Sequence, residues 1–189
     1  MERYLHLPSL GMIPVFVHSA RYDPPAPEQA SPEVLLLNGS AAQAAFVFTH
    51  SPFSVTTEAY RMLRTALLLA QAETSPKTLL FTSGMRGEGK TITVVNTAAV
   101  LAQMGVRVLV IDADLRCSAC HTILGVENKS GLADVLSGRW DPVDVIRPTV
   151  SDHLFVLSSG CLPLNPTELV GSKQMRGILA SLQAQYDYV

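Results

Sequence analysis

The central part of the chain alternates short apolar runs with a longer amphipathic one, which is typical of an α/β fold. Residues 78–83 are apolar and β-prone, and residues 106–111 form a near-continuous β-branched run. Between them the pattern predicts a helix over residues 92–104, with Gly105 as its C-cap. Strands that are apolar on both faces suit a mainly parallel sheet flanked by helices. This segment is therefore predicted to be a right-handed βαβ unit.

The same periodicities predict further elements on both sides of this unit. A helix is expected from about residue 55 to residue 72, with Ser54 or Thr56 as its N-cap and a stop near Ser75-Pro76. The remaining expected elements are a short helix at 131–138, a strand at 154–158, a helix from Asn165 to about Gln185, and the start of a strand at 187–189.

The N-terminal part of the chain has a different character. Residues 1–17 have a helical-looking start and then a short strand or extended connector, and prolines make residues 21–32 a linker with polyproline character. The apolar runs between residues 34 and 48 fit edge strands or linker equally well. We therefore expect a connector at residues 1–50 and one α/β domain at residues 51–189.

Composition limits the classes of function. With 189 residues, 48% of them hydrophobic, the chain can bury a single core of ordinary size. A net charge of −2 gives no electrostatic footprint for nucleic acid or an anionic membrane. No apolar run reaches the roughly 18 residues of a membrane-spanning helix, and Pro8 and Pro14 interrupt the one stretch similar to a signal peptide. An odd number of cysteines, three, favours reduced thiols in the cytosol.

The strongest motif is residues 84–91, GMRGEGKT, which match the P-loop pattern G-x-x-x-x-G-K-[ST]. Its glycines let the backbone wrap N–H groups around a polyphosphate. Lys90 would reach the outer phosphates, and the hydroxyl of Thr91 would bind Mg²⁺. The apolar run before the loop and the helix after it give the strand–loop–helix order that this motif requires. We therefore predict a P-loop NTPase fold that binds ATP and Mg²⁺.

Two carboxylates follow the second predicted strand, at Asp112 and Asp114. In open α/β sheets ligands bind beyond the carboxyl ends of the strands, and this rule puts the pair near the P-loop. Carboxylates there can hold Mg²⁺, directly or through water, or accept a proton from an attacking hydroxyl. The alternative is a capping or turn pair after the strand.

Cys117, Cys120 and His121 spell C-x-x-C-H, the attachment signature for c-type haem. Haem attachment would require export and a second axial ligand, and neither is signalled. A zinc or redox dithiol is the second alternative, with Cys161 and His153 as the evident further ligands. Structural thiols are the interpretation we favour.

Glu58, Arg61 and Arg64 recur every three residues, so on a helix they share one face. On spacing alone this is a solvated, self-paired face or an interaction surface.

These motifs, in this order, resemble the bacterial tyrosine kinases (BY-kinases), the cytoplasmic ATPase modules of capsular and exopolysaccharide chain-length regulators. Glu58, Arg61 and Arg64 match the family's E-x-x-R-x-x-R helix. Residues 84–91 match its Walker A loop, and Asp112, Asp114 and Arg116 match its D-x-D-x-R motif. Residues 131–138 and 165–169 are also similar to family sequence, so the resemblance covers about residues 50–189.

The resemblance implies roles for individual residues. Lys90, Asp112 and Asp114 would be catalytic, Thr91 and Asp112 would hold the metal, and Glu58, Arg61 and Arg64 would join neighbouring subunits in a ring. The implied nucleotide-binding set is Gly84, Met85, Arg86, Gly87, Glu88, Gly89, Lys90, Thr91, Ile92 and Arg116.

The resemblance also implies partners and a location. The partners would be a transmembrane chain-length regulator and a cognate tyrosine phosphatase, and the location the cytoplasmic face of the bacterial plasma membrane.

The chain departs from the family pattern in several places. The family's Walker B aspartate belongs to a strand that would begin where this sequence ends, so Asp187 is not assigned that role and the fragment by itself is expected to be inactive. The family's tyrosine-rich tail has no counterpart either. Cys117-Ser118 stand where members commonly have Arg-Pro, and Met85 stands where partition ATPases carry a signature lysine.

Three hypotheses follow. The first is an ATP-dependent protein-tyrosine autokinase tied to polysaccharide export. The second is a nucleotide-binding assembly module without kinase activity. The third, a partition-type P-loop ATPase, is disfavoured by Met85 and by the Glu58 helix.

Overall fold

The structure, a computed structural model, describes residues 13, 54–69, 78–85 and 87–189. Apart from Ile13, the predictions for residues 1–50 fall outside these ranges, as does the predicted helix end near Ser75. The described elements, in chain order, are α4 (Val55–Leu69), α5 (Lys90–Ala102), β1 (Val108–Ile111), α6 (Cys120–Leu124), α7 (Leu132–Leu136), α8 (Pro142–Val145), β2 (Arg147–Pro148), β3 (Leu154–Leu157), α9 (Pro166–Val170) and α10 (Lys173–Gln183).

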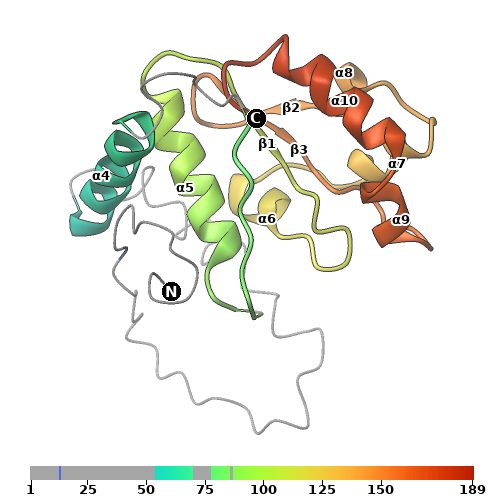
Figure 1. The fold of residues 1–189 in the computed structure, drawn as a ribbon, viewed down its shortest axis with the longest axis horizontal. Helices are drawn as coiled ribbons and strands as arrows, with labels where there is room; N and C mark the ends of the chain where they lie inside the picture. Colours follow the sequence, from blue (N-terminus) through green and yellow to red (C-terminus); the bar gives the residue numbers. More distant parts are fainter. Residues whose placement is uncertain (1–12, 14–53, 70–77, 86) are drawn as a thin grey trace, which may run out of the picture.

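A small mixed sheet forms the centre of the domain, in the order β1-β3-β2 (Figure 1). Strands β1 and β3 pair in parallel, with Val108 opposite Leu154, and the short β2 pairs antiparallel with β3. On the other side of β1, Tyr188 forms a single parallel bridge with Val108. The predicted strand start at residues 187–189 is therefore present as this bridge.

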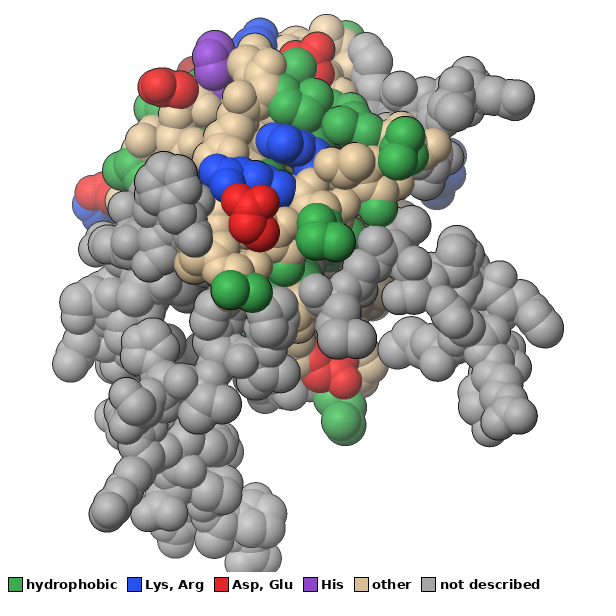
Figure 2. Space-filling view, turned by 90° about the vertical axis from the view of Figure 1, so that its left-hand side faces the viewer, with side chains coloured by type: hydrophobic (Ala, Val, Ile, Leu, Met, Phe, Trp, Pro, Cys, Tyr) green, Lys and Arg blue, Asp and Glu red, His purple; other side chains and the backbone are tan. Residues whose placement is uncertain are grey.

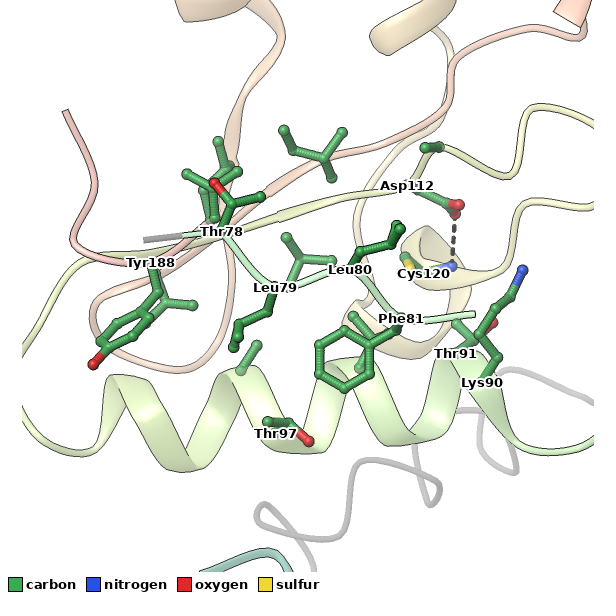
Figure 3. A pocket seen from close by; sticks show the side chains of 18 of the residues that line it. Thr78, Leu79, Leu80, Phe81, Lys90, Thr91, Thr97, Asp112, Cys120 and Tyr188 are labelled. Carbon is green, nitrogen blue, oxygen red and sulfur yellow. Dashed lines mark hydrogen bonds between the residues drawn. The ribbon is translucent and has the colours of Figure 1, made fainter. Parts of the chain in front are cut away.

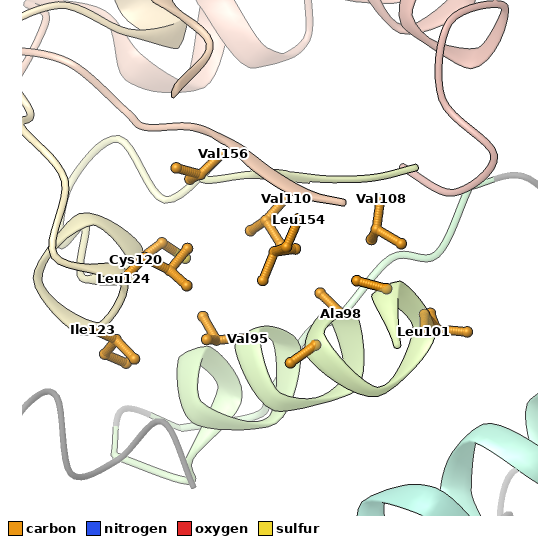
Figure 4. Close-up of a cluster of buried hydrophobic side chains, with 12 residues drawn as sticks. Val95, Ala98, Leu101, Val108, Val110, Cys120, Ile123, Leu124, Leu154 and Val156 are labelled. Carbon is orange, nitrogen blue, oxygen red and sulfur yellow. The ribbon is translucent and has the colours of Figure 1, made fainter. Parts of the chain in front are cut away.

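Both faces of the sheet are buried, because alternate side chains of β1 enter different core clusters. Val108 and Val110 face the cluster built on α5 and α6 (Figure 4), whereas Leu109 faces the cluster built on α7 and α10. Figure 1 shows the corresponding layers, with α5 on one side of the strands and α10 on the other. The α/β architecture predicted from the apolar runs is confirmed.

The predicted strand at residues 78–83 was wrong. These residues are extended but are not part of the sheet ladder. Among the described residues, the one backbone hydrogen bond of this segment runs from the N–H of Leu79 to the carbonyl of Val189, 2.9 Å away. A single bond does not make a ladder, so the first strand of the predicted βαβ unit is an extended segment.

The helix ends follow local capping. The hydroxyl of Ser54 accepts from the N–H of Thr57 at 3.2 Å, which confirms Ser54 as the N-cap of α4. Helix α5 ends at Ala102, earlier than predicted, and its C-cap is Gln103, so the assignment of Gly105 as C-cap was wrong. Gly105 follows two residues later with a positive φ.

The helix predicted from Asn165 to Gln185 is two helices, α9 and α10. They are separated by Gly171 and Ser172, and the Ser172 hydroxyl accepts from the N–H of Met175 at 3.1 Å. Because Ser172 has an extended backbone and caps a new helix, the chain turns here instead of continuing α9. None of the helices in the described part of the chain combines the length and the apolar character needed to cross a lipid bilayer.

We predict that Gly131→Ala destabilises the domain by more than about 2 kcal/mol. A Cβ at Gly131 would lie 2.1 Å from the backbone carbonyl oxygen of Ser158. Gly177→Ala on α10 is the matched control, since its Cβ would meet nothing within 4 Å. It should stabilise the helix by about 0.5–1 kcal/mol. Urea unfolding measures both effects. An unfolding midpoint of Gly131→Ala equal to that of the wild type would contradict the close packing of Gly131.

Candidate nucleotide-binding site

The P-loop adopts the left-handed backbone that its sequence predicts at two glycines. Gly87 and Gly89 both have φ of 84°. Gly89 immediately precedes α5, and its carbonyl accepts the N–H of Thr93 at 2.9 Å as the first turn closes. Backbone N–H groups at the start of a helix are suited to binding anions. The loop and the first turn of α5 therefore form the candidate phosphate site.

Gly84 differs from this prediction, because it does not have a positive φ. A Cβ there would lie 3.9 Å from the Glu88 carboxylate, an ordinary contact, so no left-handed freedom is needed at this position. The Glu88 carboxylate accepts the N–H of Met85 at 3.0 Å, an exposed hydrogen bond within the loop. Arg86 lies outside the described residues.

Lys90 and Asp114 join the two motifs directly. The ammonium of Lys90 lies 2.7 Å from Asp114 Oδ2, across 24 positions of sequence, and both side chains are about one-third exposed. Burial alone would raise the pKa of Asp114, but the Lys90 ammonium and the N–H groups of Cys117 and Arg116 outweigh it and hold this pKa below its ordinary value. The prediction that the carboxylate pair lies near the P-loop is thus confirmed in this geometry.

Asp112 is buried, and backbone donors surround its carboxylate. Oδ1 accepts the N–H of Asp114 at 3.2 Å, and Oδ2 accepts those of Ala119 at 3.2 Å and Cys120 at 3.1 Å. It therefore holds the start of α6, as the capping alternative proposed. A carboxylate has about four lone-pair positions, so one remains for a metal ion or for a water molecule bound to it. The capping and metal-binding interpretations are compatible.

The other predicted residues lie around this centre. Thr91 is partly buried on the first turn of α5, and Ile92 packs against the core cluster on that helix. Arg116 donates a 2.9 Å hydrogen bond to the Thr167 hydroxyl on α9. Asp187 accepts the N–H of Arg107 at 2.7 Å, just before β1 begins and at the opposite end of this strand from Asp112, so it does not belong to the site.

A cavity of about 550 Å³ runs from this centre along the sheet, between the extended residues 78–82, one face of α5 and β1. Figure 3 shows Lys90, Thr91 and Asp112 at one end and Thr78 and Tyr188 at the other. The polar end is the candidate phosphate site. The rest is lined mainly by apolar side chains such as Leu79, Phe81 and Val94.

The cysteines contribute their backbone to the site. Cys117 and Cys120 each donate an N–H to one of the two carboxylates, as described above. Burial, and then the nearby Asp112 carboxylate, raises the pKa of the Cys120 thiol. No group of three or more His, Cys, Asp or Glu residues suited to a metal ion occurs among the described residues, so the zinc alternative has no ligand set there. The turn at Ser118 is held by Asn128, whose amide donates to the Ser118 hydroxyl at 3.3 Å.

Of the three charged residues predicted to share one face of α4, one contacts α5 instead of solvent. Glu58 and Arg61 form an ion pair within the helix, whereas Arg64 donates to the backbone carbonyl of Val100 on α5 at 2.8 Å. Figure 2 views the side on which α4 lies, where basic, acidic and hydrophobic side chains are interspersed. Met62 is 72% exposed on the same helix.

Sequence reasoning missed the buried contacts between α4 and α5. Tyr60 on α4 is 1% exposed, and burial raises the pKa of its hydroxyl, a rise that the side chains of Thr93 and Asn96 on α5 reduce. The available signal was Asn96, a polar residue within an otherwise apolar helical run.

Comparison with known proteins identifies the fold family. Residues 79–188 match the family model described as the CobQ/CobB/MinD/ParA nucleotide binding domain. The structure named BceF Tyrosine Kinase Domain is 30% identical with a TM-score of 0.78, and the match covers 100% of this chain and 72% of that one. The chain belongs to this nucleotide-binding family, within the BY-kinases. The P-loop fold and the resemblance drawn from the motifs are thereby confirmed.

Two curated BY-kinase relatives are longer than this chain. Tyrosine-protein kinase YwqD of Bacillus subtilis is 39% identical over 151 residues, covering 80% of this chain and 64% of the relative. Tyrosine-protein kinase wzc of Salmonella typhi is 33% identical over 147 residues, covering 78% of this chain and 20% of the relative. The chain thus spans about two-thirds or less of the curated relatives it matches.

We predict that Asp114→Asn reduces the acid sensitivity of the fold. Because the pKa of Asp114 is lowered on folding, its stabilising contribution is present above its ordinary value of about 4 and is lost as the pH falls through the lower folded value. Between pH 6 and pH 3, without added magnesium, the wild type should therefore lose more stability than Asp114→Asn. Thermal unfolding measures this, with Asp152→Asn as an exposed control. Parallel losses in wild type and Asp114→Asn would contradict the ion pair.

Proposed function

We propose that this chain is the nucleotide-binding part of an ATP-dependent protein-tyrosine autokinase that regulates capsule or exopolysaccharide polymerisation and export. The observation that carries the proposal is the 2.7 Å contact between Lys90 of the P-loop and Asp114 of the acidic motif, with Asp112 beside them. The relatives named tyrosine-protein kinases support the reaction class. Such a protein would act at the cytoplasmic face of the bacterial membrane, with a transmembrane regulator and a tyrosine phosphatase as partners.

The donor set fits ATP–Mg²⁺. Bound there, this group would supply the phosphoryl group and the charge neutralisation that phosphoryl transfer needs. The backbone N–H groups of Gly87 and Gly89 would bind phosphate oxygens, and Lys90 would exchange Asp114 for them. Thr91 would hold the metal, and the remaining lone pair of Asp112 would either bind the metal as well or accept the proton of the attacking tyrosine hydroxyl. Asp114 would keep the loop after β1 in place through Cys117.

Lys90→Met should weaken ATP–Mg²⁺ binding more than tenfold, because a charge-assisted contact of about 1.5–3 kcal/mol is lost. Calorimetric titration measures the affinity. Lys129→Met is the matched control, since this lysine is 82% exposed and pairs only locally with Glu127. An unchanged affinity in Lys90→Met would refute the P-loop assignment. In the intact gene product, phosphotyrosine that forms with ATP and is lost in Lys90→Met separates the kinase from an assembly module that only binds nucleotide.

We further propose that α4 joins neighbouring copies of the chain. Arg61 and Glu58 lie on its outer part, next to the exposed Met62, and together they offer charge and apolar surface to a second copy. Arg64 would act mainly within its own chain, because it holds the carbonyl of Val100.

Arg61→Ala should therefore lower the oligomer mass without changing the melting temperature. Arg64→Ala should in addition cost about 1 kcal/mol of stability through the lost contact with α5. Analytical ultracentrifugation and thermal unfolding measure the two effects, with Arg176→Ala on the exposed face of α10 as control. An oligomer mass that is unchanged in Arg61→Ala would contradict the proposed α4 interface.

A further inference from the structure

The turn between Asp114 and α6 holds both carboxylates of the candidate site through its backbone. The N–H of Cys117 donates to Asp114 at 3.0 Å, and the N–H of Ala119 donates to Asp112 at 3.2 Å. Ser118 lies between these two donors in the chain. A shift of Ser118 would therefore displace both N–H groups and, with them, both carboxylates.

The side chain of Asn128, in the segment between α6 and α7, contacts this turn. Its Oδ1 accepts the N–H of Gly160, just after β3, at 2.8 Å. Because a backbone N–H can only donate, this contact identifies the oxygen of the amide. The NH₂ group is then the end that donates to the Ser118 hydroxyl, at 3.3 Å. Asn128 thus bridges the turn that holds the carboxylates and the loop after β3.

The loop after β3 is a rigid anchor for this bridge. The N–H of Leu132 at the start of α7 donates to the carbonyl of Ser158 at 2.7 Å. Gly160 has a φ of 75°, and a Cβ there would lie 2.6 Å from Oδ2 of Asp134. Backbone packed this closely has little room to move, so a side chain attached to it is held in place as well.

A second side chain ties the same turn to the same part of the chain. Arg116 donates to the hydroxyl of Thr167 on α9 at 2.9 Å, and α9 follows the loop that contains Gly160. Arg116 and Ser118 are the two chain neighbours of Cys117. The N–H that donates to Asp114 is therefore held from both sides.

We propose that Asn128 is a positioning residue for the nucleotide site, which holds the Ser118 turn, and through it the carboxylates of Asp112 and Asp114, against the loop after β3. The inference rests on the proposed function in that these carboxylates are the ones assigned to ATP–Mg²⁺. Asn128 itself lies outside the motifs from which the site was predicted. Its bond to Gly160 serves the fold, and its bond to Ser118 is the part that reaches the site.

The direct test is Ser118→Ala, which removes the hydroxyl that Asn128 contacts and leaves the bond to Gly160 in place. In the nucleotide-free protein, hydrogen exchange should become several-fold faster at the amides of residues 117–120 and stay unchanged in α10. The affinity for ADP–Mg²⁺ should fall about three- to tenfold, the equivalent of one lost hydrogen bond. The affinity for ADP without magnesium should not change, because the carboxylates act on the metal.

Ser181→Ala on α10 is the matched control. This serine is exposed and lies outside the lining of the cavity. Its replacement should leave the exchange of residues 117–120 and both affinities unchanged.

Asn128→Ala tests the other half of the bridge. It should reproduce the loss of ADP–Mg²⁺ affinity, and Asn128→Ala/Ser118→Ala should bind no more weakly than Asn128→Ala, because both changes break the same link. Losses that add up would overturn the proposal, as would a folded Ser118→Ala with wild-type exchange and wild-type affinity. If the wild type binds no nucleotide, the proposed function fails, and hydrogen exchange in Ser118→Ala alone decides for or against the role of Asn128.

Discussion

The packing of α5 on the parallel pair of strands β1 and β3 is the constraint on which the site depends. Small residues, Ala98, Ala99 and Ala102, let the helix lie close to the valines of β1. A helix held there must begin near the carboxyl end of β1, because it runs back along the strand that it covers. The P-loop and the acidic motif, separated in sequence by a complete helix and strand, are therefore brought together by apolar contacts. The ion pair between Lys90 and Asp114 then links them.

The carboxylate oxygens of Asp112 and Asp114 that we assign to the nucleotide site also hold the surrounding backbone in place. Asp112 is fixed by three backbone N–H groups and Asp114 by Lys90 and Cys117, so neither carboxylate is free to rotate. Such fixed groups provide preorganised charge, which is the form of stabilisation that phosphoryl transfer uses most. Cys117 and Ser118 are part of the same arrangement. The backbone of the first holds a carboxylate, and the hydroxyl of the second contacts Asn128.

Local signals explain what the sequence predicted well. The left-handed glycines Gly87 and Gly89, the β-branched strand β1 and the N-cap Ser54 are each encoded by a few adjacent residues, and each was found as predicted. The errors came from features that depend on contacts with other segments of the chain. Residues 78–83 are β-prone but make one backbone bond to a neighbouring segment, and Gly84 is not in the left-handed conformation. The break at Ser172 depends on a side chain capping three residues ahead, inside a run with helical spacing. The packing of α4 on α5 could not be foreseen, because spacing does not tell which helix faces which.

The central claim is that the P-loop and the two aspartates form one nucleotide site, with Lys90 exchanging its carboxylate partner for phosphate. A crystal structure of the chain with ADP and Mg²⁺ tests this most directly. The account predicts phosphate density against the backbone of residues 87–91, with the Lys90 ammonium turned from Asp114 toward it. Nucleotide bound instead along the apolar cavity beside Leu79 and Phe81, with the Lys90–Asp114 pair intact, would contradict it.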